Sequence, residues 1–250
     1  MNNIILSIKN LRKNYHDKNG EVNAIDDITL DVYEKDFISI VGPSGCGKST
    51  LLSILSNLEK QTSGEIMLNR PNLKIGYMLQ GDSLFPWRTI LENCLIGLEI
   101  TQTLNENTRN RVIQLLNKYG LTDFMNKYPS ALSGGMKQRV SLIRTLATNP
   151  DILLLDEPFS ALDYQTRLKL SDDVYEIIKK EGKTAIMVTH DLAEAISMSN
   201  KIVVLTKRPA NIKNVYDVVL TNASNPINNR KCKEFSSYYD KIWKDLDIHV

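Results

Sequence analysis

A glycine-rich run between two apolar stretches constrains the fold of this 250-residue chain more than any other feature. The run fits the pattern G-x-x-x-x-G-K-[ST]; it follows the strand-like residues 37–41 and precedes leucines at nearly helical spacing within 48–58. Glycines let backbone N–H groups curl around a phosphate, and the N-terminus of the following helix adds positive potential. We therefore expect a strand, a phosphate-binding loop and a helix, the loop being formed by Gly42, Pro43, Ser44, Gly45, Cys46, Gly47, Lys48, Ser49 and Thr50.

Two residues of this loop and two later carboxylates carry the chemistry that a nucleotide site needs. Lys48 should bridge the β- and γ-phosphates, and the Ser49 hydroxyl should reach Mg²⁺. Asp156 ends the apolar strand 152–155, where its carboxylate can enter the magnesium shell. Glu157 follows it and is the best candidate to polarise an attacking water, although an Asp-Glu pair could also serve only as a structural cap.

Apolar periodicity predicts strands that alternate with helices on both sides of a long helical stretch. Such an arrangement implies a mainly parallel sheet with helices on both faces. The expected strands are 4–8, 28–32, 37–41, 74–79, 152–155, 184–189, 201–205 and one around 215–220, with turn material at Gly20. The expected helices are 48–58, most of 89–147, 165–180, 192–199 and a last one around 239–246, preceded by a linker that contains Pro226.

Charge and hydropathy exclude several classes of protein. Lys and Arg number 31 and Asp and Glu 29, so the net charge of +2 provides no electrostatic basis for a nucleic-acid partner. The longest apolar runs have the length of strands, whereas a membrane-spanning helix needs about 20 apolar residues. The N-terminus lacks the pattern of a secretory signal, and three widely spaced cysteines fit a reducing compartment without a metal cluster. We therefore expect a cytosolic chain that does not cross a membrane.

Residues 132–139, Leu-Ser-Gly-Gly-Met-Lys-Gln-Arg, stand between the phosphate loop and the Asp-Glu pair. This combination resembles the ATP-binding-cassette (ABC) ATPases, and the motifs stand in family order from about residue 6 to about residue 205. The resemblance implies an α/β fold, with a P-loop NTPase core, an antiparallel β subdomain and an inserted helical subdomain. We expect the ATPase domain at 1–207 with the insertion at about 84–148, and a short C-terminal strand and helix at 208–250 without a regulatory domain.

The resemblance also assigns roles within one nucleotide site. Tyr15 would stack on adenine, although it could instead be an ordinary surface tyrosine. Gln80 would help to ligate Mg²⁺ together with Ser49 and Asp156, and it would couple the nucleotide to the helical subdomain. His190 matches the switch histidine that contacts the γ-phosphate, so with Glu157 it completes the expected catalytic pair. The implied reaction is hydrolysis of ATP, with ATP and Mg²⁺ as the bound groups.

A second anion site is expected at Ser133, Gly134 and Gly135, because their backbone amides and the Ser133 hydroxyl precede a helix. In the ABC ATPases this site meets the γ-phosphate that the opposite subunit holds. Residues 160–163, Ser-Ala-Leu-Asp, resemble the dimer-contact loop of the same family. The resemblance therefore implies that a second copy of the chain joins in a head-to-tail dimer, with ATP between the two subunits.

The segment Phe-Pro-Trp-Arg-Thr at 85–89 matches the family surface that receives a coupling helix from a membrane partner, although Phe85 and Trp87 could equally be buried locally. The resemblance thus implies a peripheral ATPase subunit of a membrane importer, on the cytoplasmic face of the membrane. Its partners would be a separately encoded transmembrane permease and, indirectly, an external solute-binding protein. ATP-induced dimerisation would drive uptake of the solute.

The motif sequences at 85–89, 132–139, 156–163 and 189–195 resemble those of the nitrate, sulfonate and taurine importers. This branch of the family also includes carriers of pyrimidine-type precursors. Asn200-Lys201 and Met136-Lys137 depart from that branch, and neither departure concerns phosphate chemistry. A soluble ABC ATPase of iron–sulfur cluster assembly stays open as an alternative. A soluble ABC protein that acts on ribosomes or DNA would normally contain two cassettes or a coiled-coil insertion. A small-molecule kinase would need no Ser-Gly-Gly helix.

Overall fold

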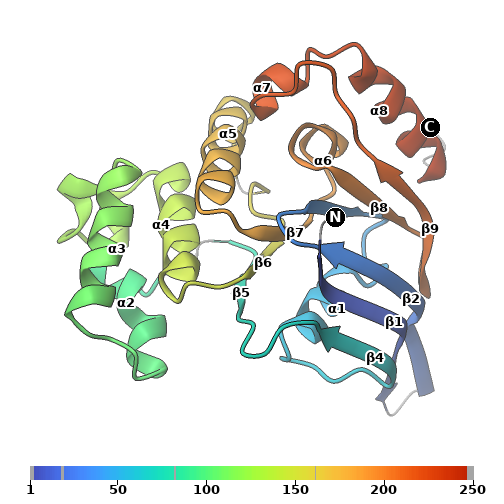
Figure 1. The fold of residues 1–250 in the computed structure, drawn as a ribbon, viewed down its shortest axis with the longest axis horizontal. Helices are drawn as coiled ribbons and strands as arrows, with labels where there is room; N and C mark the ends of the chain where they lie inside the picture. Colours follow the sequence, from blue (N-terminus) through green and yellow to red (C-terminus); the bar gives the residue numbers. More distant parts are fainter. Residues whose placement is uncertain (1–2, 18–19, 82, 161, 247–250) are drawn as a thin grey trace.

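The computed structural model describes residues 3–17, 20–81, 83–160 and 162–246, and these form a mixed sheet with helices packed around it (Figure 1). The described strands make one nine-stranded sheet in the order β4-β1-β2-β9-β8-β3-β7-β6-β5, which confirms the expected α/β class. The strands are β1 (Ile4–Asp17), β2 (Gly20–Tyr33), β3 (Phe37–Val41), β4 (Ser63–Leu68), β5 (Ile75–Met78), β6 (Ile152–Asp156), β7 (Thr184–Val188), β8 (Lys201–Leu205) and β9 (Ala210–Asp217). The helices are α1 (Lys48–Leu55), α2 (Ile90–Ile100), α3 (Glu106–Lys118), α4 (Gly134–Ala147), α5 (Tyr164–Lys180), α6 (Leu192–Met198), α7 (Pro226–Asn229) and α8 (Glu234–Asp245).

The parallel half of the sheet consists of β8, β3, β7, β6 and β5. Every residue of β3, β6 and β7 is buried, as the short continuous apolar runs predict for strands covered on both faces. Alternate residues of β6 enter different cores. Leu153 and Leu155 pack with the cluster that includes α2, α4 and α5, whereas Ile152 and Leu154 pack with the cluster that includes α1 and β1.

The antiparallel side of the sheet is larger than the sequence predicts. Strands β1 and β2 each have 14 residues and pair along most of their length, whereas only 4–8 and 28–32 were expected. Gly20 is the first residue of β2 and not part of a separate turn region. Strand β4 was not predicted, because its sequence, Ser-Gly-Glu-Ile-Met-Leu, does not alternate polar with apolar residues, and its pairing with β1 defines it.

Helices α2, α3 and α4 lie between β5 and β6 in the chain and form the lobe at the left of Figure 1, so the predicted helical insertion is present. Capping boxes start α2 at Thr89 and α3 at Asn105. Apolar residues of the three helices are buried in a common cluster, against which Tyr119 and Met136 pack partly buried. The lobe therefore has a core that continues into that of the sheet.

The C-terminal part differs from the prediction in two places. The last strand is β9 at Ala210–Asp217, which pairs antiparallel with β8 and parallel with β2, and not a strand around 215–220. The middle of β9 is exposed, with Val215 at 46%, so hydropathy does not mark the strand. The expected linker at Pro226 contains the short helix α7, and α8 forms where the last helix was expected.

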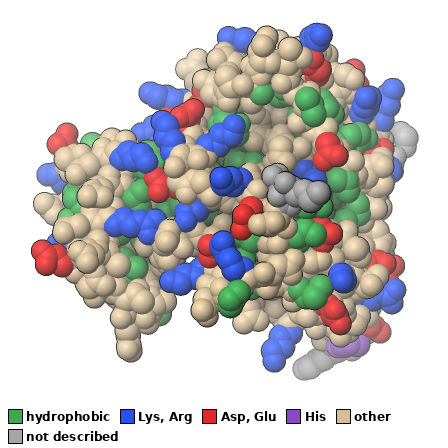
Figure 2. Space-filling model, in the orientation of Figure 1, with side chains coloured by type: hydrophobic (Ala, Val, Ile, Leu, Met, Phe, Trp, Pro, Cys, Tyr) green, Lys and Arg blue, Asp and Glu red, His purple; other side chains and the backbone are tan. Residues whose placement is uncertain are grey.

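The surface carries both signs of charge. Figure 2 shows Lys and Arg side chains interspersed with Asp and Glu over the face of the molecule that is viewed in Figure 1. Among the described residues, no helix is long and apolar enough to cross a membrane.

Candidate functional site

The predicted phosphate loop connects the central strand β3 to α1. Gly45 and Gly47 have φ angles of 71° and 121°, which residues with a side chain rarely adopt. A Cβ atom on Gly47 would also lie 3.0 Å from the carbonyl oxygen of Ala24. The glycines therefore meet a steric requirement of the loop, and the buried strand before it holds the loop at the carboxyl edge of the sheet.

Lys48 is 6% exposed, and its ammonium group donates hydrogen bonds to the carbonyl oxygens of Gly42 at 2.8 Å and Pro43 at 2.9 Å. These bonds fold the lysine side chain back over the loop. Its positive charge is thus fixed where the loop curls, which is the position that Lys48 needs to contact a bound phosphate.

Asp156, at the end of β6, lies beside the start of α1. Its carboxylate accepts hydrogen bonds from the hydroxyls of Ser49 at 3.2 Å and Tyr77 at 3.1 Å. Burial raises the pKa of Asp156, and burial together with Asp156 raises the pKa of Tyr77 to about 12, so Tyr77 stays a protonated donor. The Ser49 hydroxyl and Asp156 carboxylate are hard oxygen ligands of the kind that Mg²⁺ prefers.

The donor set around Asp156 fits Mg²⁺ only in combination with a substrate. Among the described residues, no group of three or more His, Cys, Asp or Glu could hold a metal ion. Mg²⁺ in phosphate sites usually keeps several waters and is bound through one or two carboxylates together with phosphate oxygens of the substrate. The residues present therefore suit a cation that arrives with a nucleotide.

Three predicted residues meet just beyond the ends of β5, β6 and β7. Glu157 accepts a hydrogen bond from the Gln80 amide at 3.2 Å, and its carboxylate lies 3.3 Å from Nδ1 of His190. Glu157 has a φ of 45°, a strained conformation for a residue with a side chain, and its N–H donates to Val188 O. The parallel strands thus bring together residues that are far apart in the sequence.

Tyr15 lies on β1, on the far side of the phosphate loop from β6. Its hydroxyl donates a 2.6 Å hydrogen bond to Glu59, and the Lys13 ammonium lies 4.6 Å from its ring centroid. The side chain is 37% exposed, so the ring is held in place and still accessible. Burial, followed by the hydrogen bond to Glu59, raises its pKa.

One cavity of about 270 Å³ joins these groups. It extends from Tyr15 past the loop to Glu157, so it unites the predicted base-stacking residue, the phosphate loop and the predicted water-polarising residue. The sequence did not identify Val22, Ala24 and Arg208 as lining residues, since none belongs to a motif and only sheet pairing brings β2 and β9 to the loop. The lining consists of Tyr15, Val22, Ala24, Ser44, Gly45, Gly47, Lys48, Ser49, Thr50, Glu157 and Arg208.

The Ser-Gly-Gly motif lies elsewhere, and none of its residues lines this cavity. Ser133 caps α4 by accepting a hydrogen bond from the N–H of Met136 at 3.3 Å, and Ser133 and Gly134 are exposed. A Cβ atom on Gly134 would lie 3.0 Å from Leu162, which places the motif against the segment before α5. One residue of the expected dimer-contact loop, Ala161, lies outside the described residues.

Arg167 on α5 connects the expected dimer-contact loop to the segment that follows His190. It donates to the carbonyl oxygen of Leu162 at 3.1 Å and lies 3.4 Å from the carboxylate of Asp191. Its Nε atom is 3.8 Å from the buried carboxyl of Glu194. No pattern in the sequence indicates this connection, because Leu162 and Asp191 belong to different motifs and Arg167 belongs to none.

The segment 85–89 forms a loop with an exposed aromatic residue. Trp87 is 69% exposed and Phe85 is partly buried, with 5.3 Å between their ring centroids. Asn93 holds the loop from inside: its amide donates to three carbonyl oxygens of the loop, and its oxygen accepts from the N–H of Phe85 at 2.7 Å. The alternative that Trp87 is buried locally is therefore wrong.

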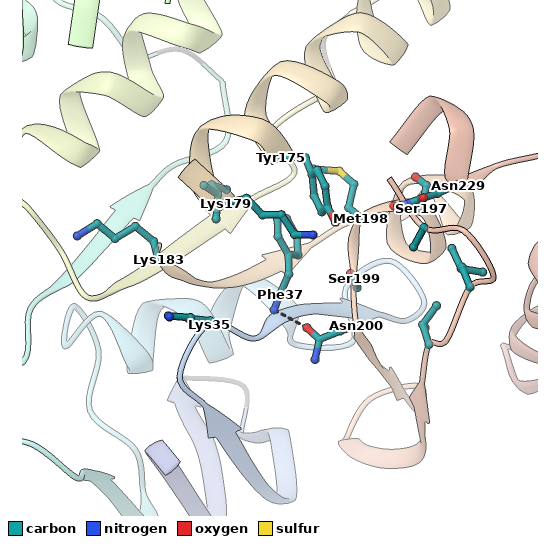
Figure 3. Close-up of a pocket in the computed structure, with 14 residues that line it drawn as sticks. Lys35, Phe37, Tyr175, Lys179, Lys183, Ser197, Met198, Ser199, Asn200 and Asn229 are labelled. Atoms are coloured by element: carbon teal, nitrogen blue, oxygen red, sulfur yellow. Dashed lines mark hydrogen bonds between the residues drawn. The ribbon is translucent and has the colours of Figure 1, made fainter. Parts of the chain in front are cut away.

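A second cavity, of about 240 Å³, lies between α5, α6 and the segment after β9, and none of the predicted site residues lines it (Figure 3). Its wall includes Phe37 and Tyr175, and the Lys179 ammonium lies 4.7 Å from the Tyr175 ring centroid. Polar groups of the lining pair within the protein, as in the hydrogen bond from the N–H of Phe37 to Asn200. This cavity is separate from the proposed site.

Comparison with known proteins supports the family that the order of the motifs indicates. The family model described as ABC transporter matches residues 25–160. An uncharacterised ABC transporter ATP-binding protein of Bacillus subtilis is 44% identical over 248 residues, which cover 97% of this chain and 95% of that protein. A taurine import ATP-binding protein of Roseobacter denitrificans is 40% identical, covering 84% of this chain and 81% of the relative. An aliphatic sulfonates import ATP-binding protein of Bacillus thuringiensis is 35% identical, covering 97% and 96%.

Solved structures show the same fold. A bacterial ABC transporter cassette, solved as a dimer, superposes with a TM-score of 0.73 at 32% identity and covers 86% of this chain and 99% of that one. A dimeric cassette in a post-hydrolysis state, bound to ADP and Pi, gives a TM-score of 0.68 at 31% identity and covers 84% and 99%. The expected cassette fold is confirmed.

Proposed function

Since this chain belongs to the ABC transporter ATP-binding family and is an ABC-type ATPase, we propose that it powers a membrane importer for a small solute. Importer subunits for taurine and aliphatic sulfonates are among its relatives, which supports a solute of the nitrate, sulfonate or taurine type or a pyrimidine-type precursor. The observation that carries the proposal is the single cavity that joins Tyr15, Lys48 and Glu157.

In this cavity ATP binds with its adenine on Tyr15 and its phosphates on the loop amides. Lys48 turns from its carbonyl partners to the β- and γ-phosphates. Ser49, Asp156 and Gln80 would hold Mg²⁺, which would supply positive charge against the charge that develops on the transferred phosphoryl group.

The Glu157 carboxylate orients the attacking water in line with the bond that breaks, and His190 contacts the γ-phosphate. Glu157 also contacts Gln80 and His190. The three side chains are therefore coupled, and a change at one of them on contact with the γ-phosphate reaches the other two.

One chain lacks part of this site, because Ser133, Gly134 and Gly135 do not line the cavity. Their N–H groups stand at the exposed start of α4, a 14-residue helix whose N-terminus favours an anion. A second copy, arranged head to tail, places this motif on the γ-phosphate of the first. The dimeric state of the solved relatives supports this arrangement.

The loop that carries Trp87 is the proposed contact for a separately encoded permease, which would hold the chain at the cytoplasmic face of the membrane. An exposed tryptophan on a loop fixed from inside suits a protein interface, since aromatic side chains are enriched there. An external solute-binding protein would act through the permease. The ATPase domain at 1–207, its insertion at about 84–148 and the C-terminal part at 208–250 remain our proposed division of the chain.

The test is a pull-down of a tagged Glu157→Gln variant from gently solubilised membranes with ATP and Mg²⁺. The variant should bind ATP, form a stable dimer, hydrolyse ATP about 10²-fold or more slowly, and retain a polytopic membrane protein. Lys48→Ala is the matched control, and it should lose ATP and the dimer together. Recovery of soluble partners alone would instead support the iron–sulfur assembly alternative.

A further inference from the structure

Arg208 lines the nucleotide cavity although it belongs to none of the sequence motifs. It is exposed and precedes β9 by two residues. Of the described residues that line the cavity, only Lys48 and Arg208 carry a positive charge. Arg208 makes no hydrogen bond or ion pair with the described part of the chain, so its charge is available to a ligand.

Strand pairing places Arg208 at the end of the cavity near Tyr15. In the parallel pair β2–β9, Ile25 lies opposite Ala210, and Arg208, two residues before Ala210, lines the cavity together with Val22 and Ala24. Val22 is in turn the partner of Tyr15 across β1 and β2. Tyr15 and Arg208 thus both line the cavity. The nucleoside part of a ligand stacked on Tyr15 would lie between them.

The same strand also brings Ala210, two residues after Arg208, close to the start of α1. A Cβ atom on Gly47, the N-cap of α1, would lie 3.6 Å from the Cβ of Ala210. The Lys48 ammonium is held at the other end of the loop, on the carbonyl oxygens of Gly42 and Pro43. The α-phosphate, which is bonded to the ribose, would thus face Arg208 and not Lys48.

We propose that Arg208 binds the α-phosphate of the nucleotide and closes the cavity at the end where the nucleoside stacks on Tyr15. The proposal rests on the proposed function for the identity of the ligand, and it adds a residue of the C-terminal part to the nucleotide site. ATP and ADP share the α-phosphate, so Arg208 strengthens the binding of both. It takes no part in distinguishing the two nucleotides.

Equilibrium titration of the whole protein with ADP and with a non-hydrolysable ATP analogue tests this role. Arg208→Ala should raise the Kd for both nucleotides by the same factor, about 5- to 30-fold, because an exposed charge-assisted hydrogen bond is lost. The loss should shrink at high salt, and Arg208→Lys should recover part of the affinity. Lys207→Ala is the matched control, since Lys207 is an exposed neighbour of like charge outside the lining, and its Kd values should equal those of the wild type.

Three results would overturn the inference: an unchanged Kd in Arg208→Ala, a loss confined to the ATP analogue, or an equal loss in Lys207→Ala. An unfolding midpoint measured without nucleotide shows whether the variants are folded. Lys48→Ala separates this inference from the proposed function. If Lys48→Ala abolishes binding and Arg208→Ala does not weaken it, only the role of Arg208 is wrong; if the wild type binds neither nucleotide, the proposed function fails first.

Discussion

Stability should depend on pH through one buried carboxyl group, that of Glu194 on α6. Its side chain is buried, it accepts a 2.7 Å hydrogen bond from the hydroxyl of Thr189, and it lies 3.8 Å from Arg167. Burial raises the pKa of Glu194 from 4.5 to about 7, and the negative charge of Asp191 adds to this, while the Thr189 hydrogen bond, Arg167 and Arg230 oppose it. The group is therefore protonated in the folded chain at a pH at which the unfolded chain has already lost the proton.

The sign of the effect follows from this difference. Because the pKa is higher in the folded chain, the contribution of Glu194 to stability is fully present below pH 4.5 and is lost as the pH rises to about 7. One pKa unit corresponds to about 1.4 kcal/mol, so the free energy of unfolding should fall by about 2.5 kcal/mol between pH 5 and pH 8 on account of this group alone.

Glu194→Gln isolates this contribution, because glutamine keeps the shape and can still accept the hydrogen bond from Thr189 without titrating. Urea unfolding of the wild type and the variant gives the change in the free energy of unfolding between pH 5 and pH 8 for each protein. Subtracting the change of the variant from that of the wild type cancels the contributions of the other carboxyl groups. The wild type should lose about 2.5 kcal/mol more than the variant between these pH values. Parallel pH profiles for the two proteins would refute the reasoning, since Glu194 would then have the same pKa in both states.

Three substitutions test other parts of the structure by urea unfolding. Gly64→Ala should lower the free energy of unfolding by about 2–4 kcal/mol, because φ at Gly64 is 92° and the new Cβ would lie 2.4 Å from the carbonyl oxygen of Asn10; an unchanged midpoint would contradict this. Asn93→Ala should cost about 2–4 kcal/mol and speed amide exchange in the loop that it holds, so unaltered exchange would show that the loop needs no such support. Leu154→Ala should cost about 2–5 kcal/mol, since the fully buried side chain leaves a cavity, and a cost below about 1 kcal/mol would mean that the core collapses to fill it.

Sequence patterns predicted the strands of the parallel core well, because burial on both faces leaves its mark within each strand's own sequence. A strand covered on both faces must be apolar throughout, so β3, β6 and β7 appear as short apolar runs wherever their partners lie. The weakly patterned strands β4 and β9 were missed or displaced. Their residues are stabilised by pairing with β1, β2 and β8, and neither strand has a continuous apolar face.

The sequence by itself determined the fold class and the family, and it named most of the residues that meet at the nucleotide cavity. The phosphate loop is a contiguous motif whose glycines and Lys48 act through nearby backbone, so local sequence is sufficient to recognise it. Only the tertiary structure decided the direct contacts of Glu157 with Gln80 and His190, and the part that Val22 and Ala24 take in lining the cavity.

The tertiary structure likewise decided the contacts of Arg208, Arg167 and Asn93. Arg208 reaches the cavity because β9 pairs with β2, and Arg167 joins two motifs because α5 packs beside the segment after β7. Such contacts depend on which distant elements become neighbours, and that choice is made by the burial of the whole sheet and not by any short stretch of the chain.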